Sequence, residues 1–409
     1  MTEVLVVGGG PVGLMTALGL AKAGVNVTVI EAEANIVYSP RAIAYAWTIL
    51  PALEYFGLLE DMIAAGHTTT ERSFRIFRTN ENIVYNHDVL AGITDHPYSL
   101  TLGQDLLAEV VLKHLERYPN ATVRWNTKFT AVTQSSHGAI VKADTPDGPT
   151  EFTAKWVVAA DGGRSPVRHA VGMSLEGFTW PRRFVVTNIY YDFAKYGWDS
   201  GYLIDRKYGT VIYKLNQEGL WRYTFSEDAG LPLETVSERI AEFIKTTLPG
   251  DKKYELALST TYAMHQRSAP RYRAGRVLLA GDSAHLTNPT SGFGLMGGMN
   301  DAFLLSETLA AVLKGEVGEE YLDRYATLRK KVFEEVTSPI STGSFKLLFE
   351  LEDEATMEKI FTDLRNRPGN PEAMLKWHML PSGLETPSLL TGLTYAQRLG
   401  KKPLPGAAS

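Results

Sequence analysis

The chain of 409 residues is long enough for about two or three domains, and its 44% hydrophobic and 21% charged residues are typical of a globular protein with a sizeable core. Its net charge of −5 argues against nucleic acid as a partner. The sequence contains no cysteine, which excludes disulfides, thiolate metal sites and redox-active cysteine pairs.

The N-terminal segment predicts a strand, a helix and a second strand. Residues 4–7 form an apolar run of strand length, residues 11–23 have helical periodicity, and residues 26–30 are again apolar. Residues 4–30 are the longest apolar stretch, but Lys22 and spaced glycines interrupt them and no basic segment precedes them. We therefore expect a βαβ unit rather than a signal peptide or a membrane span, and a cytoplasmic protein.

A glycine-rich loop, Gly8-Gly9-Gly10-Pro11-Val12-Gly13, joins the first strand to the helix. With this spacing Gly8 permits the tight turn, Gly10 lets the backbone approach a pyrophosphate, and Gly13 allows close packing of helix and strand. The free N–H groups and the dipole at the helix N-terminus, where Pro11 and Val12 stand, favour that anion. The loop therefore predicts a dinucleotide site.

An acidic residue ends the second strand of this unit. A carboxylate at this position can accept hydrogen bonds from both hydroxyls of an adenosine ribose and disfavours a 2′-phosphate. Glu31, with Ala32 beside it, is therefore assigned to the adenosine side of a site that suits FAD or NAD and not NADP.

Two further apolar runs each lead directly into an aspartate. Residues 154–160 precede Asp161-Gly162, and residues 276–280 precede Gly281-Asp282. Both runs are typical of strands buried on both faces of a parallel sheet. We therefore expect the dinucleotide-binding part of the chain to be discontinuous.

The chain between these two strands follows a different pattern. Short alternating segments broken by glycines are typical of an antiparallel sheet, and this stretch is rich in aromatic residues. The expected strands cover residues 184–191, 202–205, 210–215 and 220–225, and a helix is expected over 236–247. Further helices are expected over residues 302–313, 319–336 and 345–364.

In this order the three motifs resemble those of the single-component FAD-dependent aromatic hydroxylases related to p-hydroxybenzoate hydroxylase. Residues 161–168 are similar to the Asp-Gly-x-x-Ser-x-x-Arg element of that family, and residues 281–302 are similar to its riboflavin-binding element. The resemblance implies that Asp161 lies near the pyrophosphate and that Asp282 binds the ribityl hydroxyls. It also implies an α/β fold, in which a Rossmann-like parallel-sheet FAD domain is interleaved with an antiparallel-sheet substrate domain and followed by a helical C-terminal region.

Domain boundaries can be drawn on the same basis. The FAD-binding domain is expected to comprise residues 1–72, 101–175 and 266–340. The substrate-binding sheet domain is expected to comprise residues 73–100 and 176–265, and a C-terminal helical segment and tail to comprise residues 341–409.

The riboflavin-binding element also implies contacts to the isoalloxazine ring. The backbone is expected to meet the ring along Pro289, Gly292, Gly294, Leu295 and Met296, and a helix starting near Leu295 to aim its positive end at the flavin pyrimidine. The family usually has asparagine where this chain has Met296. Because the family contact there is largely through the backbone, we expect FAD binding to survive this departure.

Other matches are weaker. His285, inside the riboflavin-binding element, is interpreted as a structural histidine and not as a base. By resemblance, Arg41 reaches the FAD phosphates or the adenosine, Gln104 hydrogen-bonds the cofactor, and Val132 offers a backbone contact to the adenine.

The resemblance implies the reaction as well. NAD(P)H reduces FAD, O2 adds to the flavin, and the resulting C4a-hydroperoxide hydroxylates a phenolic or other electron-rich aromatic small molecule. The sequence has no second glycine-rich βαβ unit, which fits the transient docking of NADPH or NADH in this family. The expected protein is a monomer or homodimer with no nucleic-acid or membrane partner.

The substrate pocket is expected between residues 289–294, Pro289 included, and the aromatic-rich sheet. Candidates to line it are Tyr202, Tyr213 and Tyr223, with Arg222 as a partner for a substrate carboxylate. Because neighbouring strand residues face opposite ways, Arg222 and Tyr223 cannot both point inward. No catalytic base and no metal ligand is assigned, and the helices from residue 345 onward either cover the pocket or form a dimer contact.

Two alternatives remain open at this point. A flavin enzyme on the same fold can oxidise or ring-open an intermediate of secondary metabolism. A binding protein on the same fold can lack flavin chemistry, although the intact elements around Asp161 and Asp282 argue against it.

Overall fold

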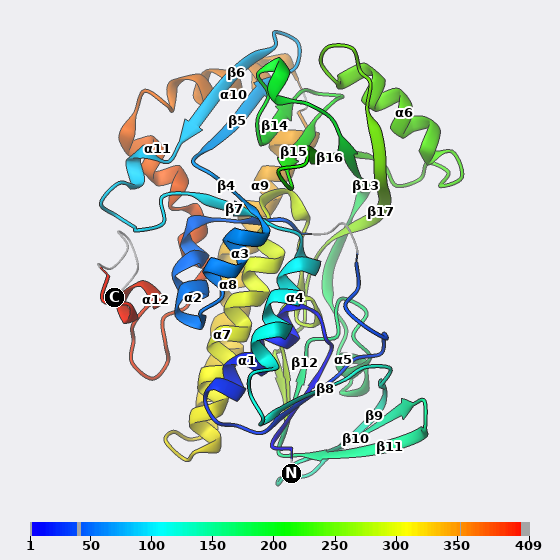
Figure 1. Cartoon of the computed structure of the whole chain (residues 1–409), viewed down its shortest axis with the longest axis vertical. Helices are drawn as coiled ribbons and strands as arrows, with labels where there is room; N and C mark the ends of the chain where they lie inside the picture. The colour runs from blue at the N-terminus through cyan, green and yellow to red at the C-terminus, as the bar shows by residue number, and fades with distance from the viewer. Residues whose placement is uncertain (1, 39–41, 352, 402–409) are drawn as a thin grey trace.

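The computed structural model describes residues 2–38, 42–351 and 353–401, and it is built around two large sheets (Figure 1). The first sheet is parallel apart from its edge strand β18, and four of its strands are fully buried apolar runs. In spatial order its strands are β18 (Arg273–Ala274), β19 (Val277–Leu279), β12 (Trp156–Ala159), β1 (Val4–Val7), β2 (Val27–Ile30) and β8 (Ala121–Arg124).

Long helices cover this parallel sheet. α1 (Pro11–Lys22) packs against both α7 (Phe293–Leu313) and α4 (Gln104–Leu115), and α7 packs against α8 (Glu320–Val332) (Figure 1). Most residues of α1 and α7 are buried. The two helices are therefore enclosed in the main core and hold the loops that precede them in fixed positions.

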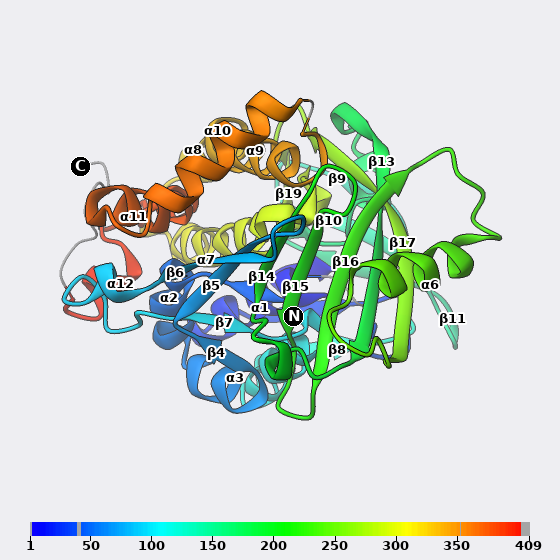
Figure 2. The same ribbon diagram turned by 90° about the horizontal axis from the view of Figure 1, so that it is seen from above.

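The second sheet has eight strands and is mostly antiparallel; β14 and β5 run parallel. In spatial order its strands are β20 (His285–Leu286), β17 (Glu255–Ser268), β13 (Glu176–Tyr190), β16 (Leu220–Asp228), β15 (Thr210–Lys214), β14 (Gly201–Ile204), β5 (Glu71–Ile76) and β6 (Glu81–Asn86). One face packs against α6 (Val236–Thr247), and the other faces the C-terminal helices, which Figure 2 shows on the opposite side of the sheet.

The C-terminal helices differ from the single segment expected over residues 345–364. A π-helical turn over residues 333–337 leads from α8 into α9 (Ser338–Phe349), and a separate helix, α10 (Glu354–Asn366), follows. The break is local in origin, because the Asp353 side chain caps α10 by accepting a hydrogen bond from Thr356 N at 2.8 Å. α11 (Pro371–His378) and α12 (Tyr395–Arg398) complete this region.

The remaining elements are small. There are two further three-stranded sheets. One consists of β9 (Lys128–Gln134), β10 (Ala139–Thr145) and β11 (Gly148–Ala154), and the other of β3 (Ala44–Tyr45), β7 (Ser99–Thr101) and β4 (His67–Thr69). The short helices are α2 (Leu50–Phe56), α3 (Leu59–Ala65) and α5 (Pro166–Ala170). The predicted fold class is confirmed, whereas the exact domain boundaries stay a prediction.

Candidate active site

Four predicted site segments meet at one edge of the parallel sheet. β1, β2, β12 and β19 are neighbours and run in the same direction, so the loops after them emerge together. Main-chain hydrogen bonds continue the sheet into these loops, since Gly8 N donates to Ile30 O at 2.9 Å and Ala280 N donates to Ala159 O at 3.0 Å. In open α/β sheets this carboxyl edge is where ligands bind.

The glycine loop after β1 has the geometry that its motif predicts. Gly8 has a φ of +112°, and a Cβ there would lie 2.3 Å from Ala160 O. A Cβ on Gly13 would lie 2.0 Å from Gly8 O, so helix and strand are in direct contact. A Cβ on Gly10 would meet no described atom within 4 Å. The loop therefore leaves open space at the N-terminus of α1, whose first turn has no acidic residue, and this space suits a phosphate group.

Glu31 is held in place by the same loop. Its Oε2 accepts a hydrogen bond from Gly9 N at 2.6 Å and its Oε1 accepts one from Glu33 N at 2.9 Å. Each carboxylate oxygen keeps a further lone pair, so the proposed contact to a ribose is compatible with these bonds. Trp125, which sequence reasoning missed, lies beside Gly9, because a Cβ there would come within 3.2 Å of the indole ring.

Asp161 carries a buried acceptor that has no partner. Its Oδ2 accepts a hydrogen bond from Val167 N at 3.1 Å, but its Oδ1 is buried and lacks a hydrogen bond within the part of the chain that the structure describes. Burial raises the pKa of Asp161, against the effect of its hydrogen bonds. An unsatisfied buried acceptor at this edge fits a ligand that carries hydroxyl groups, as FAD does.

Arg168 ties the two aspartate loops together. Its guanidinium donates to Gly163 O and to Ser283 O, both at 2.9 Å. Ser165 caps α5, and its Oγ accepts a hydrogen bond from Arg168 N at 2.9 Å. The neighbouring Asp282 is exposed, and the loop that carries it is held by the hydrogen bond from Arg168 to Ser283 O.

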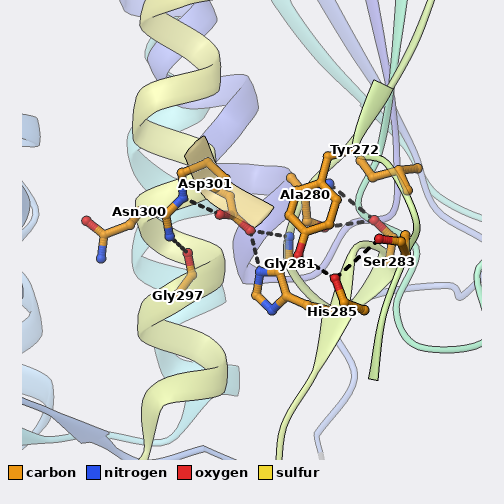
Figure 3. A network of polar contacts seen from close by, with 12 residues as sticks. Tyr272, Ala280, Gly281, Ser283, His285, Gly297, Asn300 and Asp301 are labelled. Carbon is orange, nitrogen blue, oxygen red and sulfur yellow. Dashed lines mark hydrogen bonds and ion pairs between the residues drawn. The ribbon is translucent and has the colours of Figure 1, made fainter. Parts of the chain in front are cut away.

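A buried ionic network supports this loop from within the protein (Figure 3). Asp301 on α7 accepts hydrogen bonds from Gly281 N at 2.9 Å, from His285 Nε2 at 2.7 Å and from Arg329 Nε at 2.6 Å. Burial alone would raise the pKa of Asp301, but His285 and Arg329 lower it to about 2. This is the structural role expected for His285, which is buried with its Nε2 committed to Asp301.

α7 starts at Phe293, earlier than the predicted Leu295. Gly292 precedes it with a φ of +75°, and the first turn contains no acidic residue, so a positive helix end faces the site. Met296, at the usual asparagine position, is buried, and its Sδ accepts a hydrogen bond from Ala46 N at 3.3 Å. Pro289, Gly294 and Leu295 are half-buried.

A cavity lies between this segment, the eight-stranded sheet and the C-terminal helices. Its lining joins residues from the loop before α7, from β5 and β14, and from α9 and α11. Of the two roles considered for the C-terminal helices, the lining supports the role of covering a pocket. Representative lining residues are Ser291, Phe293, Arg72, Phe74, Tyr202, Ser344, Trp377 and His378.

Only one of the four sheet residues predicted for the pocket lines this cavity. Tyr202 does so, and its hydroxyl donates to Thr290 O at 3.3 Å. Tyr213 and Arg222 are cross-strand partners on the same face but are not among the described lining residues, and Arg222 Nε donates to Asn188 Oδ1 at 2.7 Å.

The placement of Tyr223 in the pocket is wrong. Tyr223 follows Arg222 on β16 and therefore points to the opposite face, where it is fully buried against α6 and donates to Thr247 Oγ1 at 2.8 Å. Arg72 and Phe74, two residues apart on β5, both line the cavity and were missed by sequence reasoning, because alternation shows that they share a face but not which face holds the cavity.

The weaker predictions have different outcomes. Gln104 is the first residue of α4, and its N–H donates to Ala42 O at 3.1 Å. Val132 is half-buried in β9 and pairs with Val141 of β10. Arg41 lies outside the described residues. The assignment of Gln104, Val132 and Arg41 to the cofactor stays a prediction.

No helix in the ranges that the structure covers is both long and apolar enough to cross a membrane. In the same ranges, no group of three or more His, Asp or Glu side chains is arranged to hold a metal ion.

Known proteins are similar to this chain over most of its length. Residues 1–339 match the family model described as an FAD binding domain. The chain is 40% identical over 372 residues to para-nitrophenol 4-monooxygenase from Pseudomonas sp. strain WBC-3. The matched region covers 88% of this chain and 92% of that protein. It is 41% identical over 351 residues to 6-hydroxy-3-succinoylpyridine 3-monooxygenase from Pseudomonas putida strain DSM 28022 / S16. This matched region covers 85% of this chain and 89% of that protein.

Solved structures are similar as well. The crystal structure of p-nitrophenol 4-monooxygenase from Pseudomonas putida DLL-E4 superposes with a TM-score of 0.91 at 38% identity, over 94% of this chain and 98% of that one. A ternary complex of aklavinone-11 hydroxylase with FAD and aklavinone has a TM-score of 0.77 at 26% identity, over 85% of this chain and 69% of that one.

Proposed function

Because the chain belongs to the FAD binding domain family and is a flavin-dependent aromatic monooxygenase, we propose that it hydroxylates a single-ring phenol or hydroxypyridine at the expense of NAD(P)H and O2. The observation that carries the proposal is the cavity between the start of α7 and the eight-stranded sheet. The two relatives named for their substrates both act on one hydroxylated aromatic ring, p-nitrophenol in one and a hydroxypyridine in the other.

The residues of the parallel-sheet edge would hold FAD. Gly10 and the N-terminus of α1 would receive the pyrophosphate, Glu31 the adenosine ribose, and Asp282 the ribityl chain. When bound, FAD supplies the chemistry that the side chains lack: it accepts a hydride, activates O2 and transfers one oxygen atom. The protein has to position the ring and keep water out.

The geometry of the cavity supports both tasks. Ser291 and Phe293, at the start of α7, are part of its lining, so a ring bound there would lie next to the segment assigned to the isoalloxazine. The helices α9 and α11 add Leu347, Leu348 and Trp377, whose apolar side chains line the cavity and favour the exclusion of water around a bound ring. Exclusion of water would limit the unproductive release of hydrogen peroxide.

The experiment that tests the proposal is anaerobic reduction of the FAD-loaded protein by NADPH and by NADH. It should be repeated with p-nitrophenol, hydroxypyridines, aromatic acids and a polycyclic phenol. We expect one class of single-ring phenol or hydroxypyridine to accelerate reduction and then to be consumed on admission of O2. Reduction that no ligand affects, or acceleration by the polycyclic phenol alone, would contradict the proposal.

A further inference from the structure

The cavity contains one guanidinium group that has an unusual environment. Arg72 on β5 lies over three aromatic rings, with its Cζ 5.5 Å from the ring centroid of Trp377, 5.8 Å from that of Tyr213 and 6.0 Å from that of Tyr202. Within the described ranges, no Asp or Glu side chain forms an ion pair with Arg72, and none lines the cavity. The charge is therefore surrounded by aromatic faces instead of a carboxylate.

The two histidines of the cavity do not supply a compensating or competing charge. Burial and the nearby charge of Arg72 lower the pKa of His87 to about 4, and burial, His87 and Arg72 do the same for His378. Both imidazoles are therefore neutral at pH 7, and their ring centroids lie 4.6 Å apart. Burial also raises the pKa of Tyr213, so this tyrosine is a neutral phenol at the same pH.

Hydrogen bonds fix the proton positions on these histidines. His87 Nδ1 lies 2.7 Å from Thr70 O, and His378 Nε2 lies 2.7 Å from Asn86 O. A carbonyl oxygen only accepts, so these two nitrogens carry the protons. His87 Nε2, 3.2 Å from Ser99 Oγ, is then an acceptor. Of the described titratable side chains in the lining, Arg72 is thus the one that is charged at neutral pH.

Arg72 is half-buried, and a cation that is partly removed from water and has no carboxylate beside it is costly unless a ligand provides the opposite charge. Aromatic faces compensate only part of that cost. We propose that Arg72 is the counter-charge for the substrate, so that the cavity binds its single-ring aromatic ligand as an oxyanion. This inference rests on the proposed function, since it assigns the charge state of the substrate at the same site.

The oxyanion can arise in two ways that share this chemistry. The ring hydroxyl can bind as a phenolate, with its proton released to solvent, or a carboxylate substituent can carry the charge. A bound phenolate would have a further consequence, because ionisation of the ring oxygen makes the ring more nucleophilic toward an electrophilic oxygen atom. A phenolate site and a carboxylate site would bind different ligands, and the experiment below distinguishes them on that basis.

The test is a spectroscopic titration of the FAD-loaded protein with p-nitrophenol, whose yellow phenolate absorbs differently from the neutral phenol. At a pH below the pKa of free p-nitrophenol, we expect the ligand bound to the unaltered protein to show the phenolate spectrum. Arg72→Met should weaken binding by at least about tenfold, which corresponds to about 1.4 kcal/mol, and should abolish that spectrum, because it removes the counter-charge. Arg72→Lys, which keeps the charge, should retain the preference in part.

Two matched sets of controls accompany the titration. Arg206→Met removes one positive charge from the exposed turn between β14 and β15 and should leave binding unchanged. The neutral ether 4-nitroanisole should bind Arg72→Met no more weakly than the unaltered protein. Benzoate provides the second arm, because benzoate binding that depends on Arg72 identifies a carboxylate as the source of the charge.

The result that overturns the inference is binding of p-nitrophenol as the neutral phenol, or equal affinity of the unaltered protein and Arg72→Met for both p-nitrophenol and benzoate. Thermal melting of each variant shows that it is folded, and Arg72→Lys supplies the comparison should Arg72→Met fail to fold. Failure of the proposed function has a different signature: a protein that takes up no FAD, or whose FAD no pyridine nucleotide reduces, whatever ligand is present.

Discussion

The three motif glycines of the first loop are required for different reasons. Gly8 and Gly13 are required by the protein itself, because a Cβ on either would collide with a backbone oxygen. Gly10 is different, since a Cβ there meets no described atom and its φ of −75° is accessible to any residue. The open space in front of Gly10 is therefore available to a ligand, because no described protein atom fills it.

This difference predicts that Gly10→Val separates folding from FAD binding. The valine side chain would occupy the space assigned to the pyrophosphate, while the backbone conformation suits a β-branched residue. We expect a variant that folds and melts like the FAD-free protein but contains no flavin. Flavin content by absorbance and the melting temperature measure the two effects.

Gly13→Ala is the matched control for this variant. Its Cβ would lie 2.0 Å from Gly8 O, so the substitution should lower the stability of the protein and not merely its flavin content. Gly10→Val protein that purifies with a full complement of FAD would refute the assignment of this loop.

At the scale of elements, the two aspartate loops depend for their position on buried charged side chains that hydrogen-bond to them or to each other. Arg168 joins the loops at the ends of β12 and β19, and the Asp301 network joins the second of these loops to α7 and α8. Rigid elements with satisfied buried charges are a means of holding a binding loop in one geometry. The exposed Asp282 is thus positioned by residues that need not touch a ligand.

Asp301→Asn should therefore be severely destabilising. It leaves the buried Arg329 and His285 without a carboxylate, and breaking a buried pair in this way costs about 3–5 kcal/mol. Urea unfolding of the FAD-free protein measures the loss. Asp323→Asn on α8 is the control, because Asp323 is 65% exposed where it pairs with Arg273 and should contribute no more than about 1 kcal/mol. Equal stability of the two variants would argue against the network.

The same network predicts an acid limit to stability. The folded-state pKa of Asp301 is about 2, below the value of about 4 for an unfolded aspartate. Its contribution is complete above about pH 4 and is lost as the pH falls toward 2, because protonation then favours the unfolded chain. The unaltered protein should lose stability over this window more steeply than Asp301→Asn does, provided the variant is folded.

At the scale of the whole molecule, much of the fold could be predicted from local pattern. The strands β1, β12 and β19 were recognisable because each is a continuous apolar run that ends at a glycine or an aspartate. The start of α7, at Phe293, lies two residues before the predicted start near Leu295, because the glycines at this point suggest a loop. Gly298 is needed for packing, since a Cβ there would lie 2.7 Å from Val12 Cγ2.

The cavity was harder to predict because it combines distant segments. Alternation shows that Arg222 and Tyr223 face opposite ways but does not reveal which side holds the cavity. His87 and His378 are far apart in the chain, and no local signal brings their rings to 4.6 Å. Only the tertiary arrangement of β5, β14, α9 and α11 shows that Arg72 belongs to the same site.

FAD should stabilise the molecule as a whole, because the segments assigned to it come from four loops of the parallel sheet and from α7. A ligand that binds only the folded state adds about 2.7 kcal/mol at a free concentration one hundred times its dissociation constant. We therefore expect added FAD to raise the melting temperature of the FAD-free protein by a few degrees, and by more as its concentration rises. Gly10→Val should show no such rise, because it lacks the space for the pyrophosphate while keeping the same fold. A melting temperature that FAD leaves unchanged in the unaltered protein, or raises equally in Gly10→Val, would mean that these loops are not where the cofactor binds.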